Sequence, residues 1–332
     1  MSRYPWQPSL LTDESRGFTP PTQCESFDYN FSAVYSQLTN EHIGEVDRRE
    51  LLSVLFETLT NAASTIARER KAIVETGTFA DVTRTKSSQE DPVTIVDTAA
   101  EKTIAATLKK LRPHDGLIGE EGSDNPGTSS VVWIADPIDG TVNFIYGHPQ
   151  YAVSLAGVVA GTITVGGVLN VVTGQLWCAV SGEGAWSVWP NAAGGQITRL
   201  GCSGGGTLGL ALVATGFSYS ADWRKQQADF LHTVLPQVRD IRRRGSAALD
   251  LCAVAEGLVD GYYEHGINAW DFAAGALIAA EAGAIVSTPT LKTPGSCGEI
   301  VWAAAPGIGK EFAELIAQLP SALTTNSTME TR

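Results

Sequence analysis

The residues best suited to chemistry lie in the segment Trp133 to Phe144, which reads WIADPIDGTVNF. An apolar run ends there in Asp136, Pro137 fixes a turn, and Asp139 follows. A buried strand would deliver both acids at its carboxyl end, where α/β folds place their sites. Because hard cations such as Mg²⁺ choose oxygen ligands, the segment predicts a metal site to which the carbonyl of Ile138 could add a ligand.

Gly140 and Thr141 extend this motif toward phosphate binding. Gly140 permits close backbone approach, and a helix starting near Thr141 would aim free N–H groups at a phosphate. For this motif alone, an acidic surface turn with a helix cap is an equally good interpretation.

Three further segments carry acids. DPVTIVDTAAE places Asp97 at the start of a helix, IGEEG ends a strand in Glu120 and Glu121, and WDFAAGALIAAEAGA sets Asp271 at the opening of an apolar helix. Taken singly, Asp97 and Asp271 fit helix caps or first-turn charges. Together the acids are hard to explain as caps, and they would suit phosphoryl transfer, which mainly requires the charge neutralisation and in-line positioning that two or three Mg²⁺ ions provide. Without cations the clustered acids would repel one another and pack weakly.

Helical and alternating patterns predict an α/β protein. We expect a disordered or loosely docked extension over 1–40, a first half over 41–190 with most metal ligands, a second half over 191–323 that completes the site, and a tail over 324–332. Helices are expected over 48–71, 98–111, 223–235, 246–256 and 269–282. Strands are expected over 116–119, 131–135, 151–160, 163–172, 175–180, 208–214 and 258–263.

Two other motifs favour plain interpretations. The run GCSGGG at 201–206 lacks the Lys and Ser/Thr of a nucleotide loop, so a connector is expected. The cluster Arg242, Arg243 and Arg244 could bind an anion, but such a cluster is more often a solvated or interface patch.

The amino-acid composition limits the classes of partner that the chain can bind. The 332 residues include 23 Lys plus Arg and 36 Asp plus Glu, a net charge of −13, which disfavours nucleic acid and anionic membranes. Neither a leader nor a membrane span is visible, so a cytoplasmic location is expected. The cysteines suggest no disulfide framework or zinc site: Cys24, Cys178, Cys202, Cys252 and Cys297.

From about Arg48 to Gly283 the chain resembles the inositol monophosphatase family of Mg²⁺-dependent, lithium-sensitive phosphatases. It contains the motif Trp-x-x-Asp-Pro-x-Asp-Gly-Thr-x-Asn-Phe and a Trp-Asp…Glu-Ala-Gly motif. The family's spacing from Lys-Ser-Ser to Gly-Glu-Glu is met by Lys86, Ser87, Ser88, Asp91, Val93, Thr94, Asp97, Glu120 and Glu121. The resemblance implies a five-layer α-β-α-β-α sandwich, as in inositol monophosphatase and fructose bisphosphatase, usually as a homodimer.

The resemblance also assigns metal ligands, residue by residue. Glu120, Asp136 and the Ile138 carbonyl match the ligands of a first metal. Asp136, Asp139 and Asp271 match those of a second.

Catalytic roles follow from the same resemblance. Asp97 and Glu120 match the groups around a third, weaker metal. Glu120 with Thr141 would orient and deprotonate the attacking water, and Asp97 would support the Thr141 hydroxyl. The amides of Gly140 and Thr141 would hold phosphate oxygens.

The segments RRRGSAALDLC and DGYYEHGINAWD resemble the family's substrate segments. By that resemblance the Ala247 amide and the Glu264 carboxylate would contact inositol hydroxyls beside Asp139 and Asp271. Glu264 could instead be a solvated acid at a strand end.

Inositol monophosphate is therefore the expected substrate, with histidinol phosphate as its main rival. Fructose 1,6-bisphosphate and 3′-phosphoadenosine 5′-phosphate fit less well. A different class of function is a non-catalytic adaptor that binds RNA or a transcription factor. The negative charge and the complete set of acids argue against that alternative.

Overall fold

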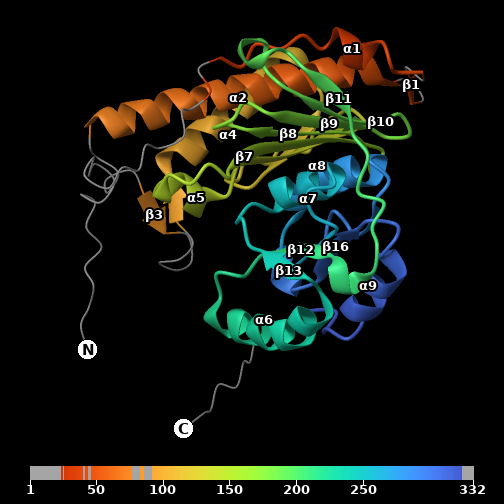
Figure 1. Cartoon of the computed structure of the whole chain (residues 1–332). Coiled ribbons are helices and arrows are strands. Elements are labelled where there is room, and N and C mark those ends of the chain that lie inside the picture. The colour runs from red at the N-terminus through yellow and green to blue at the C-terminus, as the bar shows by residue number, and fades with distance from the viewer. Residues whose placement is uncertain are drawn as a thin grey trace.

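The computed structural model describes residues 24, 26–39, 42–43, 46–76, 83–85 and 92–323. Helices and sheets alternate through it in five layers, from α2 and α4 at one side to α6 and α9 at the other (Figure 1). The layered α-β sandwich expected from the resemblance is thereby confirmed.

The first layer is formed by α2 (Arg48–Thr76) and α4 (Ile95–Leu111). Apolar residues of α2 recur every three or four positions, which places Leu51, Leu55, Leu59 and Ile66 on one face. All four are fully buried in the core between α2 and the larger sheet. Burial of this stripe fixes the helix on the sheet.

The larger sheet has seven strands in the order β11-β10-β9-β8-β7-β6-β5. Only β5 and β6 run parallel, and the other neighbours are antiparallel. Because both faces are covered, β7 is buried along its whole length and its sequence shows no polar alternation. The strands are β5 (Gly116–Gly119), β6 (Val131–Asp139), β7 (Ala152–Val159), β8 (Thr162–Asn170), β9 (Leu176–Val180), β10 (Gly184–Val188) and β11 (Ile197–Arg199).

The middle layer consists of α7 (Ala247–Ala255) and α8 (Ala269–Glu281), which are buried between the two sheets. Small residues allow the close approach of helix and sheet. A Cβ added to Gly166 of β8 would lie 3.1 Å from the Ala274 backbone. The alanine-rich helix sequences therefore reflect a layer with sheets on both sides.

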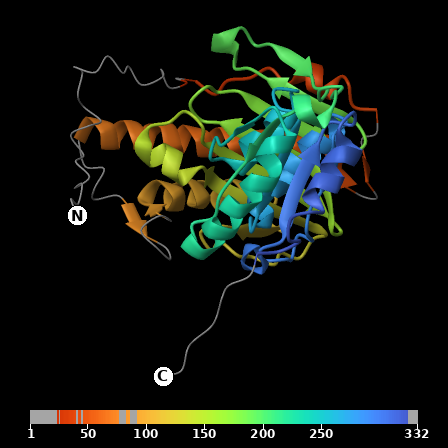
Figure 2. The same cartoon turned by 60° about the horizontal axis from the view of Figure 1, so that its bottom comes forward.

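The smaller sheet has the order β13-β12-β14-β16-β15. It is covered on its outer side by α6 (Ala221–Val234) and α9 (Gly309–Ile316), which close the fifth layer. In Figure 2 these C-terminal elements, coloured teal to blue, lie in front of the larger sheet. The strands are β12 (Leu212–Thr215), β13 (Asp240–Arg242), β14 (Gly261–His265), β15 (Ile285–Ser287) and β16 (Ile300–Ala304).

Short elements complete the fold. They are α1 (Ser32–Tyr35), β1 (His42–Ile43), β2 (Val46–Asp47), β3 (Thr83–Thr85), β4 (Pro92–Thr94) and α5 (Thr141–Tyr146). Residues 201–206 form neither helix nor strand and connect the two halves, as expected. The expected tail over 324–332 lies outside the described residues.

Two strand predictions were wrong at their starts. The expected strand over 208–214 begins as a 3-10 turn (Leu208–Leu210), and β12 follows it. The expected strand over 258–263 starts only at Gly261, because the amides of Leu258 and Val259 still bond to the Ala253 carbonyl at the end of α7. The apolar residues in these two turns gave the sequence pattern of a strand, so both strands were predicted to start too early.

Within the extension over 1–40, expected to be disordered or loosely docked, residues 26–39 pack against the rest of the chain. The ring of Phe31 stacks on Phe56 of α2 with centroids 3.6 Å apart, and Val34 and Leu38 are buried. The Tyr29 hydroxyl donates to the Gly174 carbonyl at 2.7 Å. An apolar core therefore continues into a segment whose sequence shows no regular period.

All five cysteines are free thiols in the structure. Among the described residues, no helix combines the length and apolar character needed to cross a membrane.

Candidate metal and phosphate site

The carboxyl end of β6 delivers two acids into the interior, as expected. Asp136 and Asp139 are both buried, and the pairing of β6 with β7 is irregular between them. The Asp136 carboxylate accepts the amide of Ile138 at 2.9 Å, which closes a local turn. This turn allows side chains three positions apart to face the same space.

Glu120 comes to the same place from the neighbouring strand. Gly119 at the end of β5 pairs with Ala135 of β6, so the next residue on each strand is an acid. The Glu120 amide donates to the Ala135 carbonyl at 3.3 Å. Parallel pairing therefore sets Glu120 beside Asp136.

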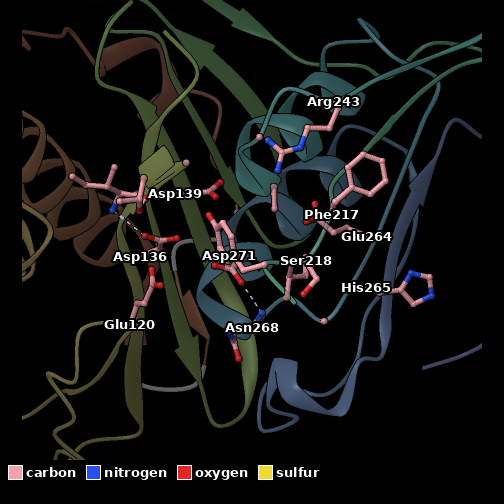
Figure 3. A pocket seen from close by; sticks show the side chains of 18 residues that line it. Glu120, Asp136, Asp139, Phe217, Ser218, Arg243, Glu264, His265, Asn268 and Asp271 are labelled. Atoms are coloured by element: carbon pink, nitrogen blue, oxygen red, sulfur yellow. Dashed lines mark hydrogen bonds between the residues drawn. The ribbon is translucent and has the colours of Figure 1, made fainter. Parts of the chain in front are cut away.

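Asp271 reaches the cluster from the first turn of α8. Its carboxylate accepts the amide of Asn268 at 2.6 Å, so it also caps the helix. Ligand oxygens of Glu120, Asp136 and Asp271 all lie within 4.8 Å of one another (Figure 3). Acids from two strands and one helix thus converge on a space suited to a divalent cation.

Asp139 is held by the start of α7. One of its oxygens accepts the Ser246 hydroxyl at 2.6 Å and the Ala248 amide at 2.7 Å. Burial raises the Asp139 pKa to about 7, and these two hydrogen bonds oppose the rise. Sequence reasoning missed Ser246, although a Ser directly before an apolar helix is the usual signal of a cap.

Burial also raises the pKa values of Asp136 and Asp271 well above the ordinary value, and the nearby Glu120 carboxylate raises them further. Carboxylates that face one another away from water are costly to ionise together. A divalent cation removes this cost because it neutralises the charge that the acids share. The donor set of clustered carboxylate oxygens therefore fits a hard metal ion.

Gly140 and Thr141 lie at the start of α5, beside the acids. Gly140 has φ +96°, and a Cβ there would come within 2.7 Å of the Gln150 carbonyl, so glycine is required. The Thr141 hydroxyl donates to the Ile138 carbonyl at 3.0 Å. Both residues line the cavity.

Asn143 fixes this turn against the second half of the chain. Its amide donates to the Gln150 and Arg244 carbonyls at 2.6 and 2.7 Å. Sequence reasoning assigned Asn143 no role, although its place in the motif was visible.

Asp97 is buried in the first turn of α4 and does not line the cavity. Its charge nevertheless raises the Asp136 pKa, which places it near the cluster. Its support of the Thr141 hydroxyl stays a prediction. Four residues that carry the resemblance lie outside the described residues: Lys86, Ser87, Ser88 and Asp91.

Glu121 does not line the cavity. Its amide donates to the buried Glu101 carboxylate at 2.7 Å, and the Ser123 amide donates to the same carboxylate at 2.9 Å. Glu101 therefore holds the loop that follows Glu120, a role that the sequence did not suggest.

A cavity of about 200 Å³ opens beside the acids. Phe217, Arg243 and Glu264 form a second wall across from Glu120 and Asp136 (Figure 3), and Ala247 also lines the cavity. The Glu264 carboxylate accepts the Tyr262 hydroxyl at 3.0 Å, and burial raises its pKa to about 8. Glu264 is thus a cavity group rather than a solvated acid. Of the arginine cluster, Arg243 is exposed to solvent, as expected for a solvated patch, and it also lines the cavity.

Comparisons with known proteins agree with this geometry. The model of the inositol monophosphatase family matches residues 47–323. The inositol-1-monophosphatase SuhB of Mycobacterium tuberculosis is 47% identical over 272 residues, which cover 79% of this chain and 91% of that protein. The Nus factor SuhB of Pasteurella multocida is 39% identical over 62% of this chain and 75% of its own length.

Solved structures show the same architecture. The structure of Mycobacterium tuberculosis SuhB has a TM-score of 0.69 at 40% identity, with 82% of this chain and 98% of that chain covered. The inositol monophosphatase of Thermotoga maritima has a TM-score of 0.66 at 28% identity, with 81% and 97% covered.

Proposed function

The chain belongs to the inositol monophosphatase family, and from this premise we propose that it hydrolyses inositol monophosphate to inositol and phosphate with Mg²⁺ as cofactor. The observation that carries the proposal is the convergence of Glu120, Asp136 and Asp271, whose ligand oxygens lie within 4.8 Å of one another beside the start of α5. Carboxylate clusters of this kind suit phosphoryl transfer, in which positioning and charge neutralisation do most of the work.

The acids would provide ligands for two metal positions and for a third, weaker one. Glu120, Asp136 and the Ile138 carbonyl would hold one Mg²⁺, and Asp136, Asp139 and Asp271 would hold a second. Asp97 and Glu120 would lie around a third, weaker position. When bound, the ions supply neutralisation of the phosphate charge and activation of water.

The remaining steps belong to this chain's own residues. Glu120 with Thr141 would orient the attacking water and accept its proton, with Asp97 behind them. Backbone amides of Gly140 and Thr141 would hold the phosphate oxygens, since a helix start presents unpaired N–H groups.

The leaving group would lie against the second wall of the cavity. The Ala247 amide can donate to a substrate hydroxyl, and the Glu264 carboxylate can accept from one. Asp139 and Asp271 would contact the same inositol ring from the side of the metal ions. This arrangement of one donor and several acceptors supports a polyol phosphate.

Two other functions are compatible with parts of the site. Histidinol phosphate would use the same metal positions, so only the second wall can distinguish it. An adaptor role is suggested by relatives named Nus factor SuhB. The net charge of −13 and the convergence of Glu120, Asp136 and Asp271 favour the enzyme. A cytoplasmic homodimer that lithium inhibits is the form we expect.

Phosphate release from a panel of esters, with Mg²⁺ or with a chelator, tests the proposal. The panel includes myo-inositol 1-phosphate and L-histidinol phosphate. Asp136→Asn should lower kcat/KM by roughly a thousandfold, because one ligand serves two metal positions. The matched control Asp229→Asn changes an exposed aspartate of α6 and should retain wild-type activity. Absence of Mg²⁺-dependent release from any ester would overturn the proposal.

A further inference from the structure

Three consecutive arginines at the end of β13 have different surroundings. Arg242 donates to the Asp240 carboxylate at 2.6 Å, and Arg244 donates to the buried Asp250 carboxylate at 2.7 Å. Arg243 lies between them in the sequence, is exposed to solvent and lines the cavity. Within the described part of the chain, its guanidinium makes no hydrogen bond or ion pair, whereas both neighbours do.

Arg243 lies on the side of the cavity where the leaving group would bind, away from the acids that would hold the metal ions and the phosphate. Figure 3 shows Arg243, Phe217 and Glu264 on one side of the cavity and Glu120 and Asp136 on the other. Among the described residues that line the cavity, Arg243 is the one Lys or Arg side chain.

Arg243 is also close enough to Glu264 for its charge to act on that carboxylate. Glu264 is already oriented, because it accepts the Tyr262 hydroxyl. The wall thus presents a fixed acceptor and a cationic donor that has no hydrogen-bond acceptor among the residues that the structure describes.

We propose that Arg243 determines specificity by selecting leaving groups with uncharged hydroxyls and rejecting leaving groups that carry a cation. This inference rests on the proposed phosphatase function and names the substrate class that the second wall prefers. Arg243 acts as a positioning and discriminating residue and takes no part in the transfer of the phosphoryl group.

The argument follows from what each group can do. A hydroxyl of a polyol can donate to Glu264 and accept from Arg243 at the same time. An ammonium group can donate to Glu264 but has no lone pair for Arg243, so the guanidinium would face a like charge. A hydrogen bond to a charged group changes affinity by roughly tenfold to a hundredfold. Discrimination of that size would separate a polyol phosphate from histidinol phosphate.

The test measures kcat/KM for myo-inositol 1-phosphate, L-histidinol phosphate and 4-nitrophenyl phosphate with Mg²⁺. The wild-type protein should prefer the inositol ester. Arg243→Met should lower the ratio of the inositol value to the histidinol value about tenfold or more, with the aryl ester affected less than the inositol ester. Arg243→Lys keeps the charge and should restore much of the preference against histidinol phosphate.

Arg242→Met is the matched control, because Arg242 is as exposed as Arg243 but is paired with Asp240 and does not line the cavity. It should leave the ratio of the two esters at the wild-type value. An unchanged ratio in Arg243→Met, or a wild-type preference for histidinol phosphate, would overturn the inference while the phosphatase function stands. A wild-type protein that hydrolyses none of the three esters would overturn the proposed function and the inference together.

Discussion

Several carboxylates in this site have a structural contact as well as a place in the cluster. Asp271 accepts the amide of Asn268 and caps α8, while Asp139 accepts two donors from the start of α7. Each acid is therefore oriented before any ion binds, and less conformational entropy is lost when a ligand arrives.

Glu264→Gln tests the second wall at the residue scale. The amide keeps the size of the side chain but loses the acceptor on one end, so a polyol hydroxyl is bound less well. We expect KM for myo-inositol 1-phosphate to rise about tenfold and KM for an aryl phosphate to change far less. Steady-state kinetics with both esters measure this. Equal changes for the two esters would show that Glu264 has no contact with the leaving group.

The start of α7 links packing to chemistry at the scale of elements. Ser246 accepts the Leu249 amide as the cap of α7 and donates its hydroxyl to Asp139. Ser220 occupies the same cap position of α6, but its side chain makes no capping hydrogen bond. The two serines are a matched pair.

Ser246→Ala should lower the free energy of unfolding by about 2 kcal/mol, because a cap and a buried hydrogen bond are lost together. It should also weaken Mg²⁺ binding, since Asp139 loses one of its two donors. Ser220→Ala should change stability by less than about 0.5 kcal/mol. Urea denaturation measures the free energy of unfolding of both variants. Equal decreases for Ser246→Ala and Ser220→Ala would contradict a special role for Ser246.

Elements with a strong period were predictable from the sequence, and those set by tertiary contacts were not. The helix expected over 269–282 corresponds to α8 (Ala269–Glu281). It was predictable because Asp271 lies in its first turn and apolar residues cover its buried faces. The carboxylates were found because they follow strands or open helices. Arg243 could not be singled out from the sequence, because only the turn of the chain after β13 decides which of the three arginines faces the cavity.

At the scale of the whole molecule, the acid cluster lies between layers that contribute to it from both halves of the chain. β5 and β6 bring Glu120 and Asp136, and α8 brings Asp271. The site therefore exists only when the two halves pack together. The docking of residues 26–39 on α2 and the larger sheet extends the same core. The docking of this segment could not be predicted from the sequence, because its contacts are made by aromatic residues without a regular spacing.

The pKa values predict how metal-free stability depends on pH. Asp139 has a folded pKa of about 7, against an ordinary value of 3.8, and Asp136 and Asp271 are raised as well. The folded state therefore holds more protons than the unfolded state between these values, so stability falls as pH rises from about 4 through 7.

Mg²⁺ should reverse this trend, because it binds the ionised carboxylates of the folded state alone. We expect Tm to rise by roughly 5 °C or more at saturating Mg²⁺, and the gain to be larger at pH 8 than at pH 5. Melting curves with Mg²⁺ and with a chelator at both pH values measure it. Identical curves under all conditions would contradict a cation site in this cluster.

Binding of Mn²⁺ as a spectroscopic substitute for Mg²⁺ tests the cluster most directly, because it needs no substrate. Titration followed by electron paramagnetic resonance should show binding to the wild-type protein and to Asp229→Asn, with affinity at least tenfold lower for Asp136→Asn. A wild-type protein that binds no Mn²⁺, or an Asp136→Asn variant that binds it equally well, would contradict the account.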